Sequence, residues 1–190
     1  CKCFINVKEK TAKEVLQKIG NATYLFQKTI TNQHPAINAI YDKSINTIRM
    51  VTIKNLKTGK IDVMPSIMRI GSRGSRVDNT SQGGYLVQVD LETGKLHKFG
   101  FMKPRYGTKC EEHFDSKVRF EDCTIPYFGD AKQMALHFHK LLGNLHSIGW
   151  DIAITEDGPM FIEGNDNWEI SGPQTDCYGW RDIFNPYFFK

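Results

Sequence analysis

Residues 149–165 constrain the chain more than any other segment, because they combine a hairpin pattern with acidic side chains. The segment reads GWDIAITEDGPMFIEGN. Its two apolar runs, residues 150–155 and 160–165, flank a turn signal at Asp157-Gly158. Such a pattern predicts two antiparallel strands joined by a tight turn. The bulky apolar side chains in both runs indicate that this ribbon is largely buried.

The polar side chains of the hairpin predict a metal site. Glu163 and Asn165 are two residues apart, so strand alternation places them on one face, and the turn brings Asp151 opposite them. Acidic groups are almost never buried without a partner or a metal. Oxygen ligands of this kind suit Mg²⁺. We therefore expect Asp151, Glu163 and Asn165 to bind magnesium; the alternative is that they are polar residues on a solvent-facing strand.

The rest of the chain indicates an α+β fold. Thr11 and Glu14 form a capping box for a helix that ends at Gly20, and a second helix is expected to begin at Asp130. The apolar stripe of this second helix consists of Met134, Phe138, Leu141 and Leu145. Strands are expected at residues 3–7, 23–30, 46–54, 61–70, 85–90 and 96–101, in addition to the hairpin of residues 149–165. Turns within residues 57–60 and 92–94 predict antiparallel pairing, and residues 102–129 are expected to form a long loop.

Composition narrows the class of protein. The chain has 25 basic and 21 acidic residues, and this mild charge, without a long basic run, does not indicate a nucleic-acid-binding protein. No stretch approaches the roughly 20 apolar residues that a membrane helix needs. Five cysteines at irregular spacing do not form a disulfide framework, so a reducing, cytoplasmic compartment is expected. A zinc site at Cys110, His113 and Cys123 would lack a fourth ligand at recognised spacing.

The hairpin, with Asp, an Asp-Gly turn and then Glu-x-Asn, resembles the magnesium signature of the ATP-grasp superfamily. The similarity covers nearly the whole chain and is greatest to the sugar-transfer-associated ATP-grasp group of polysaccharide-biosynthesis proteins. It is carried by the runs SINTIRMVTI, MRIGSRGSRVDNTSQGGY and IGWDIAITEDGPMFIEGN. The chain begins at Cys1, and the flap and phosphate-binding lysine of the superfamily are not found, so an N-terminal portion is expected to be missing.

The resemblance implies ATP and two Mg²⁺ ions as cofactors, with residues 1–30 as the remainder of the small lobe and residues 31–190 as the catalytic lobe. Glu163 would bridge both ions, with Asp151 beside it and Asn165 on the second ion. Where many relatives carry an arginine, this chain has Gly149, so the positive charge would come from Arg49, Arg69 or elsewhere. The implied catalytic residues are Arg69, Arg49 and Asn79, and the implied nucleotide-binding residues are Lys28, Thr29, Ile30, Asn46, Arg69, Arg76 and Asn79.

The implied reaction is carboxylate–amine ligation through an acyl phosphate. The acceptor would be an anionic small molecule, such as a sugar acid, bound between the Gly-rich loop of residues 71–84 and the loop of residues 102–129. Arg73, Arg76 and Arg105 would favour its negative charge. Two alternatives stay open: a kinase that phosphorylates a hydroxyl, and a nucleotide-binding scaffold without turnover. Isolated arginines such as Arg49 are also commonly no more than solvated strand residues.

Overall fold

The computed structural model describes residues 13–14, 16–17, 29–102, 108–175 and 179–188. The chain divides into two compact units, residues 1–31 and 32–190. In the first unit the described residues 13, 14, 16 and 17 are helical, as expected, whereas Thr29 and Ile30 are not in a strand. Lys28 and the other residues of the expected strands 3–7 and 23–30 lie outside the described residues. A strand at residues 23–30 therefore stays a prediction for its first part and is wrong for its last two residues.

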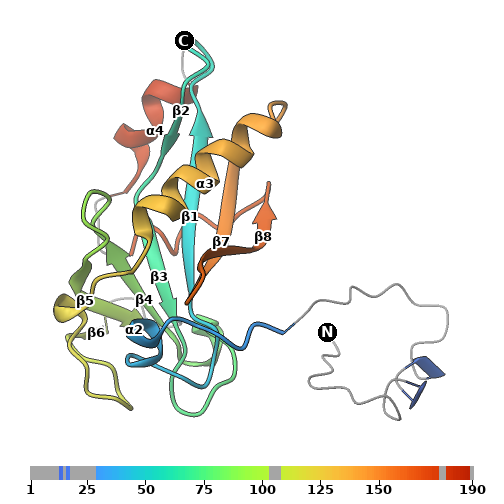
Figure 1. The fold of residues 1–190 in the computed structure, drawn as a ribbon. Coiled ribbons are helices and arrows are strands. Elements are labelled where there is room, and N and C mark those ends of the chain that lie inside the picture. The colour runs from blue at the N-terminus through green and yellow to red at the C-terminus, as the bar shows by residue number, and fades with distance from the viewer. Residues whose placement is uncertain (1–12, 15, 18–28, 103–107, 176–178, 189–190) are drawn as a thin grey trace. The chain divides into compact units, whose positions relative to one another are not determined.

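The second unit is built on one antiparallel sheet (Figure 1). Its strand order is β6-β5-β4-β3-β1-β7-β8, with β2 paired to β1. All pairings between these strands are antiparallel, which confirms the α+β class with an antiparallel sheet. The strands are β1 (Thr47–Lys54), β2 (Ile61–Val63), β3 (Ser66–Ile70), β4 (Tyr85–Val89), β5 (Leu96–Met102), β6 (Lys109–Cys110), β7 (Ser147–Thr155) and β8 (Gly158–Asn165).

Two predictions about the strands need correction. The expected strand at residues 61–70 is interrupted at Pro65, because a proline has no N–H to donate to the sheet. The expected loop at residues 102–129 contains β6 and a 3-10 helix, η2 (Phe120–Asp122). The described part of this segment is anchored at single positions, since His113 and Phe120 are fully buried. The three expected hairpins are confirmed, with β7 and β8 each a few residues longer than predicted.

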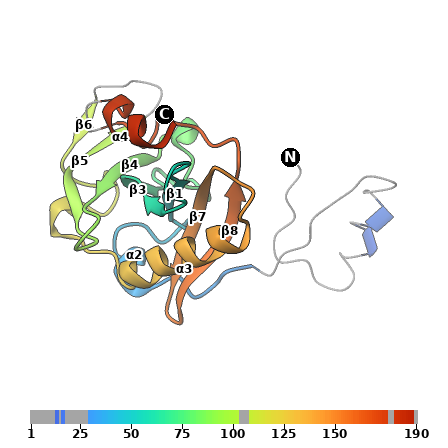
Figure 2. The ribbon, with the colours of Figure 1, turned by 90° about the horizontal axis from the view of Figure 1, so that it is seen from above.

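Helices α2 (Pro35–Asn38) and α3 (Phe128–Leu141) cover one face of the sheet (Figure 2). The helix α3 begins before Asp130, which lies in its first turn, where a negative charge favours the helix dipole. Its predicted stripe is confirmed at Met134 and Leu145, which pack against the core, and is wrong at Phe138 and Leu141, which are exposed. Small side chains at Ala131 and Ala135 are buried instead and let the helix approach the sheet. The core on this face is made by Ile48, Met50, Met68, Val87, Trp150 and Ile152.

The opposite face is covered only in part, by helix α4 (Arg181–Phe188), which the sequence did not predict (Figure 2). Trp180 is buried here in a small cluster with Val51 and Ile53 from β1. Beside this cluster, the face carries the polar side chains of the candidate site together with the apolar Ile67 and Leu86. No helix among the described residues has both the length and the apolar character to cross a membrane.

Candidate active site

A β-bulge in β8 brings Glu163 to the polar face of the sheet. Ile152 of β7 pairs with Phe161, yet the preceding residue, Asp151, pairs with Glu163, so Ile162 is an extra residue in the strand. Without this residue, alternation would place Phe161 and Glu163 on the same face. With it, Phe161 packs against the core while Glu163 is exposed beside Asp151. Bulges occur often next to active sites, where they redirect a side chain.

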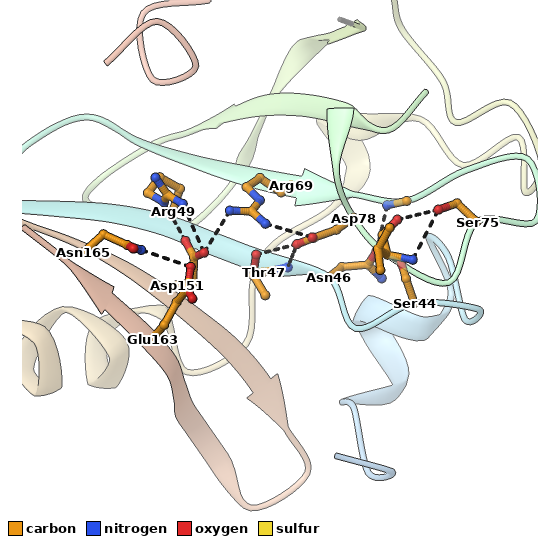
Figure 3. A network of polar contacts seen from close by, with 12 residues as sticks. Ser44, Asn46, Thr47, Arg49, Arg69, Ser75, Asp78, Asp151, Glu163 and Asn165 are labelled. Carbon is orange, nitrogen blue, oxygen red and sulfur yellow. Dashed lines mark hydrogen bonds and ion pairs between the residues drawn. The ribbon is translucent and has the colours of Figure 1, made fainter. Parts of the chain in front are cut away.

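The structure brings the three predicted metal ligands together. Asp151 and Glu163 are direct partners across β7 and β8, and Asn165 follows on the same face. The amide Nδ2 of Asn165 donates to Oε1 of Glu163 at 3.1 Å. Figure 3 shows the two carboxylates and the amide gathered at this end of the ribbon. A cation placed there would have oxygen ligands from two neighbouring strands.

Two arginines contact the Asp151 carboxylate. The guanidinium of Arg49 donates from Nε to Oδ1 at 2.5 Å and from Nη2 to Oδ2 at 3.1 Å. Arg69 on β3 donates from Nη1 to Oδ2 at 2.9 Å. This arrangement follows from register, because Arg49 pairs with Asp151 across β1 and β7, and all three side chains lie on one face.

Arg69 is also held from its other side. Its Nη2 donates to Oδ1 of Asp78 at 2.9 Å, and Oδ2 of Asp78 accepts from the backbone N and Oγ1 of Thr47, at 3.1 and 2.5 Å. The result is an alternating ion-pair row of Arg49, Asp151, Arg69 and Asp78 (Figure 3). Only 5% of the Asp151 side chain and 18% of the Arg69 side chain are exposed. Burial alone would lower the pKa of Arg69, but the nearby carboxylates of Asp78 and Asp151 outweigh it and raise that pKa.

A cavity of about 180 Å³ adjoins this ion-pair row. It brings together Arg49, Arg69 and Asn79, the three residues expected to be catalytic. Its other lining residues come from β3, β4, the start of the 3-10 helix η1 (Thr80–Gln82) and the segment after β8. These are Ile67, Leu86, Thr80, Glu169, Gly172 and Pro173.

Other predicted residues lie apart from this cavity. Asn46 is buried, and its side chain donates to the carbonyl of Tyr41 and accepts from Ser44 Oγ and the Gly71 backbone, so its polar atoms are engaged in holding the loop at residue 71. Arg76 is exposed on the loop and does not line the cavity. Thr29 and Ile30 belong to the first unit, and the expected nucleotide contact of residues 28–30 stays a prediction.

Sequence reasoning missed three residues of this region: Asp78, Thr47 and Glu169. Asp78 stands in the run that carried the resemblance, between Val77 and Asn79, but a single acidic residue in a Gly-rich loop gives no signal of burial. Its role is visible only because the loop folds it against Arg69. Glu169 follows the hairpin without any periodic pattern that would place it.

Comparison with known protein families identifies the chain. The profile described as sugar-transfer associated ATP-grasp matches residues 15–177. The chain belongs to the sugar-transfer associated ATP-grasp family. No match was found among curated proteins or among solved structures. The ATP-grasp fold implies use of ATP, typically together with Mg²⁺, and the family name associates the chain with sugar transfer.

The donor set of this ATP-grasp chain fits a magnesium ion. Two carboxylates on adjacent strands repel each other unless a cation lies near them. In the structure the guanidiniums of Arg49 and Arg69 supply that charge at Asp151. The described part of the chain, this site included, has no group of three or more His, Cys, Asp or Glu side chains that could hold a metal. The predicted magnesium ligands remain the carboxylates of Asp151 and Glu163 and the side-chain amide of Asn165.

The structure gives a reason for a glycine at residue 149, where the resemblance implied an arginine. A Cβ at Gly149 would lie 2.5 Å from Cβ of Trp168, far inside contact distance. The indole of Trp168 donates from Nε1 to Ser147 Oγ at 3.1 Å and so stays over this position. A longer side chain at residue 149 would therefore collide with Trp168. The cations that contact Asp151 in the structure are Arg49 and Arg69 instead.

Proposed function

We propose that this ATP-grasp protein is a carboxylate–amine ligase that activates an anionic acceptor, a sugar acid, as an acyl phosphate. The observation that carries the proposal is the placement of two arginines between a carboxylate–amide cluster and a small cavity. Such a site offers positive charge where a phosphoryl group would be transferred and a separate space for the group that receives it. We also propose a reducing, cytoplasmic setting, because the five cysteines stand at irregular spacing along the chain.

In this proposal Asp151, Glu163 and Asn165 hold the magnesium ions. Bound Mg²⁺ would neutralise charge on the phosphates and align the transferring group. Arg69 contacts the transferring phosphoryl group, and its position is fixed because Asp78 holds the far side of its guanidinium. Arg49 gives up one or both of its bonds to Asp151 and turns toward phosphate oxygens. These residues thus supply positioning and charge compensation, which are the main needs of phosphoryl transfer.

The reaction has two steps. A carboxylate oxygen of the acceptor attacks the γ-phosphorus of ATP, the bond from that phosphorus to the bridging oxygen breaks, and ADP leaves with the bonding electrons. An amine then attacks the acyl carbon, inorganic phosphate leaves, and the amine loses a proton as the amide forms. No nucleophilic side chain of the protein is required, because ATP drives the activation.

Trapping with hydroxylamine tests the proposal. Incubation with ATP, Mg²⁺, hydroxylamine and each of a panel of sugar acids should yield the hydroxamate of any acid that stimulates ADP release. Glu163→Gln should abolish both products while leaving the fold intact by circular dichroism. A stable phosphate ester, with ADP release and no hydroxamate, would show a kinase instead.

A further inference from the structure

The cavity beside the ion-pair row is small and has fixed walls. Its volume of about 180 Å³ lies below the range of roughly 300–1,000 Å³ that is usual for drug-sized ligands. Ile67 and Leu86 form an apolar floor on the polar face of the sheet. Gly172 rests on this floor, since a Cβ there would lie 3.4 Å from Cδ1 of Ile67 and 3.6 Å from Cδ1 of Leu86. A cavity of this size holds a molecule of monosaccharide size rather than a whole nucleotide.

The segment after β8 forms one wall of this cavity and is held to the sheet by a hydrogen bond. The side-chain amide of Gln88, on β4, donates to the carbonyl of Pro173. Within the segment, Oε2 of Glu169 accepts from the backbone N of Gly172 at 3.2 Å, and Thr175 Oγ1 donates to the carbonyl of Gly172. The wall is therefore present before a ligand arrives, which reduces the entropy cost of binding.

The polar side chains that line the cavity are of three kinds: cationic, neutral and anionic. Arg49 and Arg69 line it from the ion-pair row, and guanidinium groups bind carboxylates with parallel hydrogen bonds. Asn79 and Thr80 contribute an amide and a hydroxyl, and Glu169 contributes a carboxylate. A carboxylate accepts from hydroxyl donors, whereas it repels a second negative charge.

We propose that this cavity binds the acceptor as a hydroxylated carboxylic acid of monosaccharide size. Its carboxylate is directed toward Arg49 and Arg69, next to the site of phosphoryl transfer. Its hydroxyl groups are directed toward Thr80 and Glu169, which act as specificity-determining residues, and its C–H surface rests on the apolar floor. The inference rests on the proposed function, because that function gives the cavity its role as the acceptor site.

Matched small probes test the inference by binding alone. The ¹⁵N-labelled chain, with Mg²⁺ and a non-hydrolysable ATP analogue, is titrated with three hexuronates, with the corresponding hexoses and with cyclohexanecarboxylate. At least one hexuronate should shift the amide signals of Leu86, Thr80 and Gly172. The hexose, which lacks the carboxylate, and cyclohexanecarboxylate, which lacks the hydroxyls, should each bind at least about tenfold more weakly, as the loss of one charge-assisted hydrogen bond predicts.

Two variants assign the hydroxyl contacts. Glu169→Ala and Thr80→Val should weaken hexuronate binding several-fold and leave the affinity for cyclohexanecarboxylate and for the ATP analogue unchanged. Equal affinity for cyclohexanecarboxylate and the best hexuronate, no hexuronate that binds more tightly than its hexose, or unchanged hexuronate binding in both variants would overturn the inference. Hydroxamate formation from an acid that does not shift these three amides would refute the acceptor site while leaving the proposed ligase function in place.

Discussion

Replacing Arg49 by methionine should make the chain bind a divalent cation more tightly when nucleotide is absent. In the structure Arg49 makes two hydrogen bonds to Asp151, at 2.5 and 3.1 Å, and Arg69 makes a third. A cation that binds through Asp151 has to compete with Arg49 for the same oxygens. In the variant this competition is removed, while Arg69 still compensates the buried carboxylate.

The size of the effect follows from the bonds that the cation must replace. Only 13% of the Arg49 side chain and 5% of the Asp151 side chain are exposed, so solvent screens the pair weakly. A hydrogen bond to a charged group contributes about 1.5–3 kcal/mol. Because about 1.4 kcal/mol corresponds to tenfold in affinity, Arg49→Met should bind Mn²⁺ at least about tenfold more tightly than the wild type.

Electron paramagnetic resonance of free Mn²⁺ measures this affinity directly. Arg181→Met, which removes an exposed arginine at the start of α4, is the matched control and should leave the affinity unchanged. Adding Asp151→Asn to Arg49→Met should abolish the gain, because the ligand is lost. If Arg49→Met binds Mn²⁺ no more tightly than the wild type, then Arg49 does not compete with a cation for the Asp151 carboxylate. That result would refute the assignment of Asp151 as a metal ligand.

Three further predictions concern stability. Asp78→Asn should lower the free energy of unfolding by about 3 kcal/mol, measured in urea, because it breaks a largely buried ion pair; a loss below about 0.5 kcal/mol would contradict the pairing. Burial lowers the pKa of His139 and of His113, so the unfolded chain takes up protons at a higher pH than the folded one, and the free energy of unfolding should fall as the pH drops below about 6.5. The His139→Gln variant should show a shallower dependence, and an unchanged slope would exclude His139 as a cause. Gly149→Ala should destabilise the fold by about 1–3 kcal/mol through its clash with Trp168, and less so in a Trp168→Ala background, as thermal unfolding would show.

The sequence predicted much of the sheet because hairpins leave local signals. The turns at Asp157-Gly158 and within residues 92–94 stand between apolar runs, and both hairpins were confirmed. Helix α3 was predicted as an element, but its buried face only in part, because the fully buried Ala131 and Ala135 carry little weight in a hydrophobic pattern. Helix α4 was missed because Pro186 argues against a helix when the surrounding packing is unknown.

Within the candidate site, the residue types could be predicted more readily than their contacts. Strand alternation correctly placed Glu163 and Asn165 on one face. It could not show that the bulge at Ile162 separates Glu163 from Phe161, since a bulge depends on the partner strand. Arg69 was expected to bind the nucleotide and Arg49 to take part in catalysis, and their partners in the structure are the carboxylates of Asp151 and Asp78. Such pairings join residues that are distant along the chain, and only the folded sheet brings them together.

The most direct test of carboxylate activation follows an oxygen atom. A sugar acid labelled with ¹⁸O in its carboxylate is incubated with the protein, ATP, Mg²⁺ and an amine donor, and the inorganic phosphate is analysed by mass spectrometry. If the carboxylate attacks the γ-phosphorus, one labelled oxygen moves from the acid to each phosphate released with an amide product. Unlabelled phosphate, in a reaction that consumes ATP and depends on the acid, would contradict the acyl phosphate and with it the proposed ligase function.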